Sequence, residues 1–537
     1  MENMTNTIKQ SSETIEVNEI RNRSPQMSSE NSNEEHEEKH IVETLIAPGM
    51  NAVYNSKVKL LNDALQDIGM GRFQWTLFVV AGFGWFMDNF WMLSVSLISV
   101  PVKAEFNVEK IAYMTLYKYL GLVIGATGWP LLSDLVGRLF AFNVTIFMSS
   151  ISALIAAGVP NYGSLNFFMF CIGFATGGNQ PVDGMLFVEL IPASHQHLLL
   201  YESLFWGFGQ FVASIIGWPL IVNFSCSGEE TCTYQNNLGW RYTYWTLGGL
   251  TLLMSFIRLF ANMYESPKFY IGKGKNDKAV DVVKAIAKRN NTTTWLTVEH
   301  FDNIDYELND KKDIEADNTV EQNKAIISRS LENFKNWNLL FKTKTMTITT
   351  LLLWVIWGCV GMGFPLFNSF LPFYLEWKGA QTGSTSLNKT YRDYAILSVC
   401  AIPSGIFAGY LSNVKYVGRK GVGFIGGVLT GVFMYLFTTT KTGGAYLGFT
   451  CVVSFVQMFI YGAMYAYTPE VFPAPARGAA CASCSFWNRI CGLMGPVMSL
   501  YLDINNGKPV FVSGALFIVA GVLFILLPYE TRGMAAS

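Results

Sequence analysis

Ionisable side chains inside long apolar runs are the residues of this sequence best suited to chemistry. Asp88 lies near the middle of the run Trp75–Val100, and Arg489 lies well inside the run Ala479–Tyr501. A charge inside a bilayer is costly, so each residue needs a partner or a task. A carboxyl in a dry cavity can carry a proton, and an Arg fork can bind an anionic solute. A static ion pair between helices is the alternative for both.

Amide and aromatic side chains in these runs are the candidates for holding a solute. Amides donate and accept hydrogen bonds, which suits hydroxyl and acetamido groups, and aromatic rings can stack on a sugar ring. The candidates are Asn89, Asn179, Gln180, Gln210, Asn368 and Gln457, together with Trp206, Trp357 and Tyr461. Packing between helices is the alternative for each ring. Lys118, in a further apolar run, is expected to extend its ammonium group towards the membrane surface.

The runs that carry these residues are long enough to cross a membrane as helices. A hydrocarbon core of about 30 Å needs about 20 mostly apolar residues per helix. The first six runs are Trp75–Val100, Ile111–Leu132, Leu139–Val159, Phe167–Ile191, Leu198–Phe224 and Tyr242–Met263. The last six are Ile348–Tyr374, Asp393–Leu411, Val422–Thr440, Ala445–Tyr467, Ala479–Tyr501 and Pro509–Pro528. The sequence therefore predicts twelve spanning helices in an all-α membrane protein.

The composition favours a membrane carrier over an enzyme or a nucleic-acid binder. Of the 537 residues 51% are hydrophobic and only 14% are charged, whereas soluble chains carry about 25% charged residues. The net charge of −1 gives no attraction to nucleic acid. The sequence has no nucleophile–base–acid set and no metal-ligand spacing, so we expect neither catalysis nor a metal or other cofactor. The expected partners are a small-molecule solute, protons and the lipid bilayer, and we expect a monomer.

Polar segments divide the chain into five parts. Residues 1–70 are rich in Ser, Asn and Glu and predict a disordered tail. Residues 71–264 and 346–530 hold six runs each, 265–345 form a charged loop, and 531–537 form a short tail. The loop is the most basic segment, so the positive-inside rule predicts that it and both termini are cytoplasmic.

The opposite loops carry two predicted modifications. Asn223 and Asn388 begin glycosylation sequons in loops that this topology places outside the cell. Cys226 and Cys232 lie in a polar segment on the same side, where a disulfide between them is as plausible as two free thiols.

A loop motif occurs at corresponding places in the two halves. Asp134 to Arg138 follow the second run, and Asn413 to Arg419 follow the eighth, each with a Gly before its Arg. An Asp and an Arg around a tight turn can join neighbouring helix ends by charge-assisted hydrogen bonds. The repeat resembles the loop motif of the major facilitator superfamily. That resemblance implies two pseudo-symmetric six-helix bundles and a role for these residues in conformational change.

Three further segments are similar to sugar-porter signatures of that superfamily. They are Glu265-Ser266-Pro267, Pro469-Glu470-Val471-Phe472-Pro473 with Arg477-Gly478, and Pro528-Tyr529-Glu530-Thr531-Arg532-Gly533. The resemblance implies a cytoplasmic salt-bridge network that breaks and re-forms as the halves rock. Its expected members are Asp134, Arg138, Glu189, Glu265, Arg419, Glu470 and Arg477. For Asp183 and Glu189, near one end of the fourth run, structural pairing is the expected role.

The fourth run narrows the branch of the family. The segment from Gly173 to Asp183 resembles the synaptic-vesicle-glycoprotein-like branch and its fungal relatives, whose permeases carry sugars, amino sugars and organic anions. Asp88 matches the position of the proton-coupling Asp of related sugar symporters. The Gln-Gln pair of sugar porters is replaced by a run around Trp357, and their Pro-Trp by Met464-Tyr465, so an ordinary hexose site is not expected.

We therefore predict a twelve-helix, proton-coupled permease that works by alternating access, in the plasma membrane. A sugar or an amino sugar such as N-acetylglucosamine is the first expected solute, and a small organic anion bound by Arg489 is the second. A nutrient sensor that binds solute without moving it is the rival from another class, and the few residues after Pro528 disfavour it because such sensors usually carry a long signalling tail.

Overall fold

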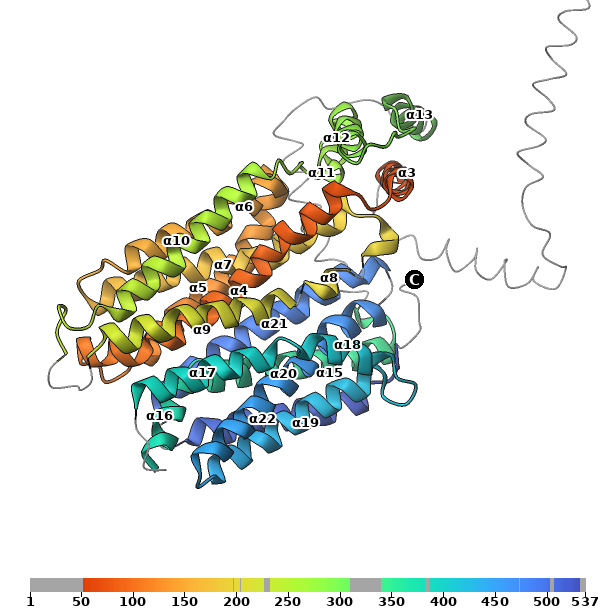
Figure 1. The fold of residues 1–537 in the computed structure, drawn as a ribbon. Coiled ribbons are helices and arrows are strands. Elements are labelled where there is room, and N and C mark those ends of the chain that lie inside the picture. The colour runs from red at the N-terminus through yellow and green to blue at the C-terminus, as the bar shows by residue number, and fades with distance from the viewer. Residues whose placement is uncertain are drawn as a thin grey trace, which may run out of the picture. The chain divides into compact units, whose positions relative to one another are not determined.

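This computed structural model describes residues 52–196, 198–202, 204–226, 232–309, 340–381, 386–472, 474–502 and 507–531. Its described helices form two bundles, and the first bundle comes from the first half of the chain. The bundle contains α4 (Arg72–Phe106), α5 (Ala112–Val136), α6 (Arg138–Ala156), α7 (Tyr162–Leu190), η1 (Ala193–His195), α8 (Leu198–Tyr201), α9 (Leu204–Phe224) and α10 (Gly239–Phe260). Figure 1 shows these helices side by side, from red α4 to yellow-green α10.

The second bundle repeats the arrangement with later helices. It contains α15 (Lys344–Asn368), α16 (Leu371–Gln381), α17 (Leu387–Ala401), α18 (Ser404–Asn413), α19 (Gly418–Thr439), α20 (Gly443–Val471), α21 (Ala474–Tyr501) and α22 (Lys508–Leu526). Each of the twelve predicted runs coincides with one helix or with a broken pair, namely α8/α9, α15/α16 or α17/α18. The predicted all-α membrane fold with two six-helix bundles is confirmed.

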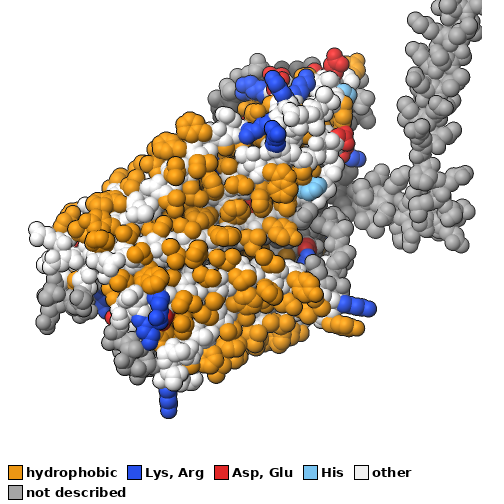
Figure 2. All heavy atoms as spheres, in the orientation of Figure 1, with side chains coloured by type: hydrophobic (Ala, Val, Ile, Leu, Met, Phe, Trp, Pro, Cys, Tyr) orange, Lys and Arg blue, Asp and Glu red, His pale blue; other side chains and the backbone are white. Residues whose placement is uncertain are grey.

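The outer faces of the bundles suit a lipid environment. Among the described residues, nine helices, with α17 and α18 taken as one, are long and apolar enough to cross a membrane. On the face drawn in Figure 2, hydrophobic side chains cover the bundles, and Lys and Arg side chains gather towards their ends. The long helices α7, α10 and α21 fall outside that set, and α7 and α21 carry polar residues such as Gln180 and Arg489 that face the interior.

Four helices cover one end of the first bundle, which we call the α12 end; the opposite end is the α16 end. They are α3 (Ala52–Ile68), α11 (Pro267–Gly272), α12 (Asn276–Arg289) and α13 (Val298–Asn309). Leu61 and Leu65 of α3 pack with Val283 and Ile286 of α12 in one buried cluster. The predicted disorder through residue 70 is therefore wrong for α3, because this amphipathic helix buries its apolar face against the central loop.

Glycines bring α5 and α7 into backbone contact. A Cβ on Gly121 or Gly125 of α5 would overlap the backbone of α7, and a Cβ on Gly173 or Gly177 of α7 would overlap the backbone of α5. Small residues at such crossings let membrane helices approach closely, where van der Waals contact stabilises them. This contact fixes the position of α7, which carries Gln180 towards the centre of the molecule.

The two bundles meet along α5 with α21 and along α9 with α17. Three of the hydrogen bonds between them lie between the centre of the bundles and the α16 end. Ser96 donates to the Asn368 carbonyl over 2.9 Å, and the Ser214 and Ser398 hydroxyls are 2.8 Å apart. Tyr391 donates to the Leu97 carbonyl. These bonds join the bundles in the half of the molecule nearer the α16 end.

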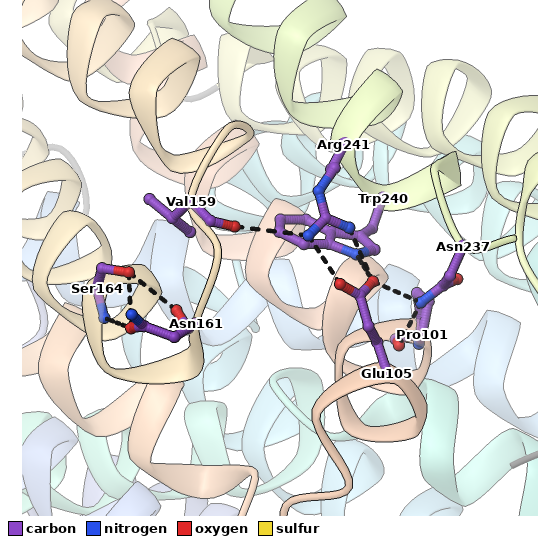
Figure 3. Close-up of polar contacts among 8 residues, drawn as sticks. All are labelled: Pro101, Glu105, Val159, Asn161, Ser164, Asn237, Trp240 and Arg241. Atoms are coloured by element: carbon purple, nitrogen blue, oxygen red, sulfur yellow. Dashed lines mark hydrogen bonds and ion pairs between the residues drawn. The ribbon is translucent and has the colours of Figure 1, made fainter. Parts of the chain in front are cut away.

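A buried ion pair fastens the α16 end of the first bundle (Figure 3). Arg241 of α10 donates two hydrogen bonds to the Glu105 carboxylate of α4, over 2.8 and 2.7 Å. Trp240 and Asn237 also donate to Glu105, over 2.8 and 3.1 Å, and Asn237 donates to the Pro101 carbonyl. Because the carboxylate is saturated with donors, its burial is compensated and α4 is held against α10.

Candidate functional site

A cavity between the two bundles gathers residues from seven helices. Its volume is about 70 Å³, and it is lined from both halves of the chain. The lining residues are Asp88, Asn89, Met92, Tyr119, Leu122, Gln180, Trp206, Gly361, Phe364, Met458, Tyr461, Tyr465, Ser485, Asn488, Arg489 and Gly492. Six of the predicted coupling and binding residues lie together here: Asp88, Asn89, Gln180, Trp206, Tyr461 and Arg489.

Charged groups of both signs meet at this cavity. Asp88 comes from α4 and Arg489 from α21, and the positive charges of Arg489 and Lys118 act on the Asp88 carboxyl. Lys118 is 1% exposed and donates to the Trp91 carbonyl, so the expectation that it reaches the membrane surface is wrong. The Asp88 Oδ1 atom is buried without a hydrogen-bond partner among the described residues.

Gln180 connects the bundles across the cavity. Its Nε2 donates to the Tyr465 hydroxyl over 3.0 Å, and its Oε1 accepts from Arg489 Nη2 over 3.4 Å. Arg489 is 8% exposed, and this long contact engages only one of its five N–H donors. A guanidinium in such a position can bind the two oxygens of a carboxylate at once.

Aromatic rings form the walls. Trp206 lies 5.4 Å from Tyr465 and 6.0 Å from Tyr461 between ring centroids. Phe364 lies 5.5 Å from Tyr461. These rings give the cavity an aromatic lining, on which a flat ring of a solute could pack.

Three of the other predicted amides, Asn368, Gln457 and Gln210, are used in contacts between helices. Asn368 donates to Gln457 Oε1 over 3.1 Å, and Gln210 accepts from Asn89 over 3.3 Å. Asn179 is fully buried in α7, and neither atom of its amide group has a hydrogen-bond partner among the described residues. The predicted ring of Trp357 donates to Thr468 over 3.1 Å. None of Asn368, Gln457, Gln210, Asn179 and Trp357 belongs to the lining of this cavity.

The predicted salt-bridge network divides into two related clusters at the α12 end. In the first bundle, Arg138 pairs with Glu189 over 2.8 Å and with Asp134 over 3.3 Å. Glu265 accepts hydrogen bonds from the backbone N–H groups of Arg138 and Leu139, over 2.9 and 3.1 Å. The carboxylate thus caps the N-terminus of α6, where negative charge is favoured.

The second bundle repeats this cluster. Arg419 pairs with Glu470 over 3.1 Å. Glu530 accepts from the backbone N–H groups of Arg419 and Lys420, over 2.8 and 3.2 Å, as Glu265 does in the first bundle. Glu530 was missing from the predicted network, although it occupies the position of Glu265 in the repeat. The predicted side chain of Arg477 lies outside the described residues.

The predicted modifications lie at the α16 end. Cys226 and Cys232 form a disulfide with a Cα–Cα distance of 5.5 Å. Asn223 and Asn388 are both exposed, and Asn388 accepts a hydrogen bond from Trp218 over 2.8 Å. Their glycosylation stays a prediction.

Comparison with known proteins gives the family. Residues 74–496 match the sequence profile of the Major Facilitator Superfamily. The chain belongs to the Major Facilitator Superfamily. It is similar to the MFS siderochrome iron transporter 1 of Ceriporiopsis subvermispora, with 41% identity over 91% of this chain and 93% of that one. It is also similar to the niacin transporter NiaP of Acinetobacter baylyi, with 25% identity over 87% and 97% of the two chains.

Solved structures agree on the fold. The xylose transporter XylE from E. coli, in a partially occluded inward-open conformation, superposes with a TM-score of 0.63 and 16% identity over 86% of this chain and 99% of that one. By its family, this protein is an integral membrane transporter of small solutes and not an enzyme.

Several lining residues of this facilitator were missed from the sequence. Tyr119, Tyr465, Ser485 and Asn488 line the cavity but were not among the predicted binding residues. The spacing of Ser485, Arg489 and Gly492 was an available signal, because positions four and three residues apart share one face of a helix.

Proposed function

We propose that this facilitator carries a small organic solute with one carboxylate and a flat ring, together with a proton. The observation that supports it is the charge at the cavity. Arg489 lines the cavity together with one carboxyl, Asp88, and the buried amine of Lys118 also acts on that carboxyl. Buried charges need compensation, and a carboxylate of the solute would provide it between the aromatic walls.

Asp88 supports a coupling role because it competes with the solute. An ionised Asp88 satisfies part of the positive charge of Arg489, whereas a protonated Asp88 leaves that charge for the solute. Proton and anion then bind more tightly together than apart, and the effect is reciprocal. Release of the proton and the anion at the opposite face of the membrane completes a symport cycle by alternating access.

A neutral sugar or amino sugar, the solute first expected from the sequence, has weaker support. Of the amides that favoured it, Asn89 and Gln180 line the cavity, whereas Asn368 and Gln457 lie outside the lining and bond to each other. The niacin transporter among the similar proteins carries, by its name, a pyridine carboxylate.

The basic residues at the α12 end support a cytoplasmic location for that end, since Lys268 and Lys273 lie there next to Arg138. We also propose that the protein works as a monomer in the plasma membrane.

Uptake into liposomes containing the purified full chain tests the solute. With an acidic outside, labelled niacin or another aromatic monocarboxylate should accumulate, N-acetylglucosamine should not, and a protonophore should abolish accumulation. Arg489→Gln should raise the apparent Kd for the anion about 10- to 100-fold, the loss of a charge-assisted hydrogen bond. Lys59→Gln, at an exposed residue of α3, is the matched control and should behave as wild type.

Asp88→Asn separates proton coupling from binding. The neutral amide imitates the protonated acid, so counterflow exchange of the anion should persist while accumulation against a gradient is lost. Accumulation of N-acetylglucosamine that Arg489→Gln leaves unchanged would overturn the anion in favour of the sugar. Binding without any movement of solute would favour the sensor.

A further inference from the structure

A second buried acid lies in the first bundle, away from the cavity lining. Glu202 follows α8 directly and precedes α9, and its side chain is 0% exposed. Neither of its carboxylate oxygens has a hydrogen-bond partner among the described residues. A buried carboxylate without a donor is far more costly than a buried carboxylic acid.

The charged groups near Glu202 are an acid and a base that already form an ion pair with each other. Asp183 of α7 and Arg258 of α10 are both 0% exposed and form an ion pair. Their charges are the ones that act on the Glu202 carboxyl. Two acids and one base are therefore buried together, which leaves one negative charge uncompensated if both acids are ionised.

Arg258 has no donor left for Glu202. Its Nε and Nη2 donate to the Val80 carbonyl over 3.2 and 3.1 Å, and its Nη1 donates to the Phe142 carbonyl. Both Nη atoms also donate to Asp183. Because a guanidinium carries five N–H donors, these five contacts account for all of them.

Other charged groups on the surrounding helices are engaged elsewhere. Asp88 of α4 faces the cavity, Glu189 of α7 pairs with Arg138, and Glu470 of α20 pairs with Arg419. The α4 backbone lies against this cluster, where a Cβ on Gly84 would overlap the Asp183 carboxylate and one on Gly82 would overlap the ring of Phe205. Glu202 is thus enclosed by backbone, apolar surface and a closed ion pair.

We propose that Glu202 is a second proton-binding site, protonated in this conformation and able to release its proton at the α12 end when the bundles move. The short helix α8 beside it packs against α20 of the second bundle. Rocking of the bundles moves α8 past α20 and exposes Glu202. The carboxylic O–H bond then breaks, water takes the proton, and the carboxylate remains. Return to the buried state needs a proton from the same end.

This site sets a dependence on pH that is separate from the coupling proposed for Asp88. Glu202 takes and returns its proton at one face, so it adds no proton to the number carried across. Low pH at the α12 end favours the conformation described here, and high pH favours the one in which Glu202 is exposed. This dependence on pH does not require a bound solute.

Infrared spectroscopy of the full chain in lipid nanodiscs tests the proton directly. At neutral pH the wild type should show the carbonyl band of a buried carboxylic acid that Glu202→Gln lacks. Asp305→Asn is the control, because Asp305 forms an ion pair with Lys57 and its loss should remove no such band. Spectra of the wild type and Glu202→Gln with the same acid bands would overturn the proposal.

Asp183→Asn provides an independent variant. It removes the partner of Arg258, so Glu202 should ionise in its place and the acid band should disappear although Glu202 is still present. An acid band that is unchanged in Asp183→Asn would contradict the proposal that Asp183 and Glu202 share the single positive charge of Arg258.

Movement is measured with spin labels at Lys278 of α12 and Tyr416 beside α19. Their separation should change with pH in the wild type and in Asp88→Asn, but stay in the low-pH form in Glu202→Gln. A pH dependence of Glu202→Gln equal to that of the wild type would overturn the switch. Because no solute is present, failure here leaves the anion proposal untouched, and failure of the uptake experiment leaves this one standing.

Discussion

Some buried side chains of this facilitator can occupy their positions only because a neighbouring residue is small. Asp183 and Arg258 lie directly against α4 because Gly84 has no side chain, and Arg258 Nη2 would be 3.3 Å from a Cβ there. Gly84 precedes Asp88 by one helical turn, so the ion pair and the cavity acid lie on one face of α4. The position of Asp88 is thus tied to a buried pair that no motif of the sequence marked.

Gly84→Ala tests this dependence. The added methyl group overlaps the Asp183 carboxylate, and such overpacking costs about 1–3 kcal/mol. We expect a clear fall in the melting temperature of the detergent-solubilised protein and reduced transport. Gly249→Ala in α10 is the control, since its Cβ would meet nothing within 4 Å, and it should melt as the wild type or slightly higher. Equal melting temperatures of Gly84→Ala and Gly249→Ala would show that α4 shifts to accommodate the added methyl group without loss of stability.

At the scale of elements, each bundle is held by capped and paired helix ends. Glu265 and Glu530 cap α6 and α19 at the α12 end. At the other end Glu105 and Arg241 join α4 to α10, with the Arg241 guanidinium 4.2 Å from the Tyr234 ring centre. Helices fixed at both ends move as one body, as rocking between two faces of the membrane requires.

Arg241→Ala should destabilise the first bundle. It leaves Glu105 buried without its cation, and breaking one side of a buried pair costs about 3–5 kcal/mol. Thermal unfolding followed by circular dichroism should show a lower midpoint and less folded protein after purification. The double variant Glu105→Gln with Arg241→Met should recover part of the loss, because no charge stays unpaired. A single variant as stable as the wild type would mean that water reaches Glu105.

At the scale of the whole molecule, the described conformation has its bundles joined by hydrogen bonds in the half nearer the α16 end. Ser214 and Ser398 face each other across the α9–α17 contact with their hydroxyls 2.8 Å apart. A transporter that alternates must break this contact once in each cycle. The same separation would let two cysteines at these positions form a disulfide.

Ser214→Cys with Ser398→Cys should therefore stop transport when oxidised. Uptake by the double variant should fall to background and return after reduction, while each single variant keeps its activity under both conditions. Full uptake by the cross-linked protein would contradict alternating access at this contact.

The amino-acid sequence predicts the membrane class, the twelve runs and the duplicated motif, because spans need long apolar stretches whatever their partners. It also brought Asp88, Gln180 and Arg489 forward as ionisable or polar groups at depth. Only the tertiary structure decided that Asn368 and Gln457 bind each other, that Lys118 is buried near Asp88, and that Glu202 lies beside a closed ion pair. These contacts join residues far apart in the chain, and helical periodicity specifies which face a residue occupies but not which helix that face meets.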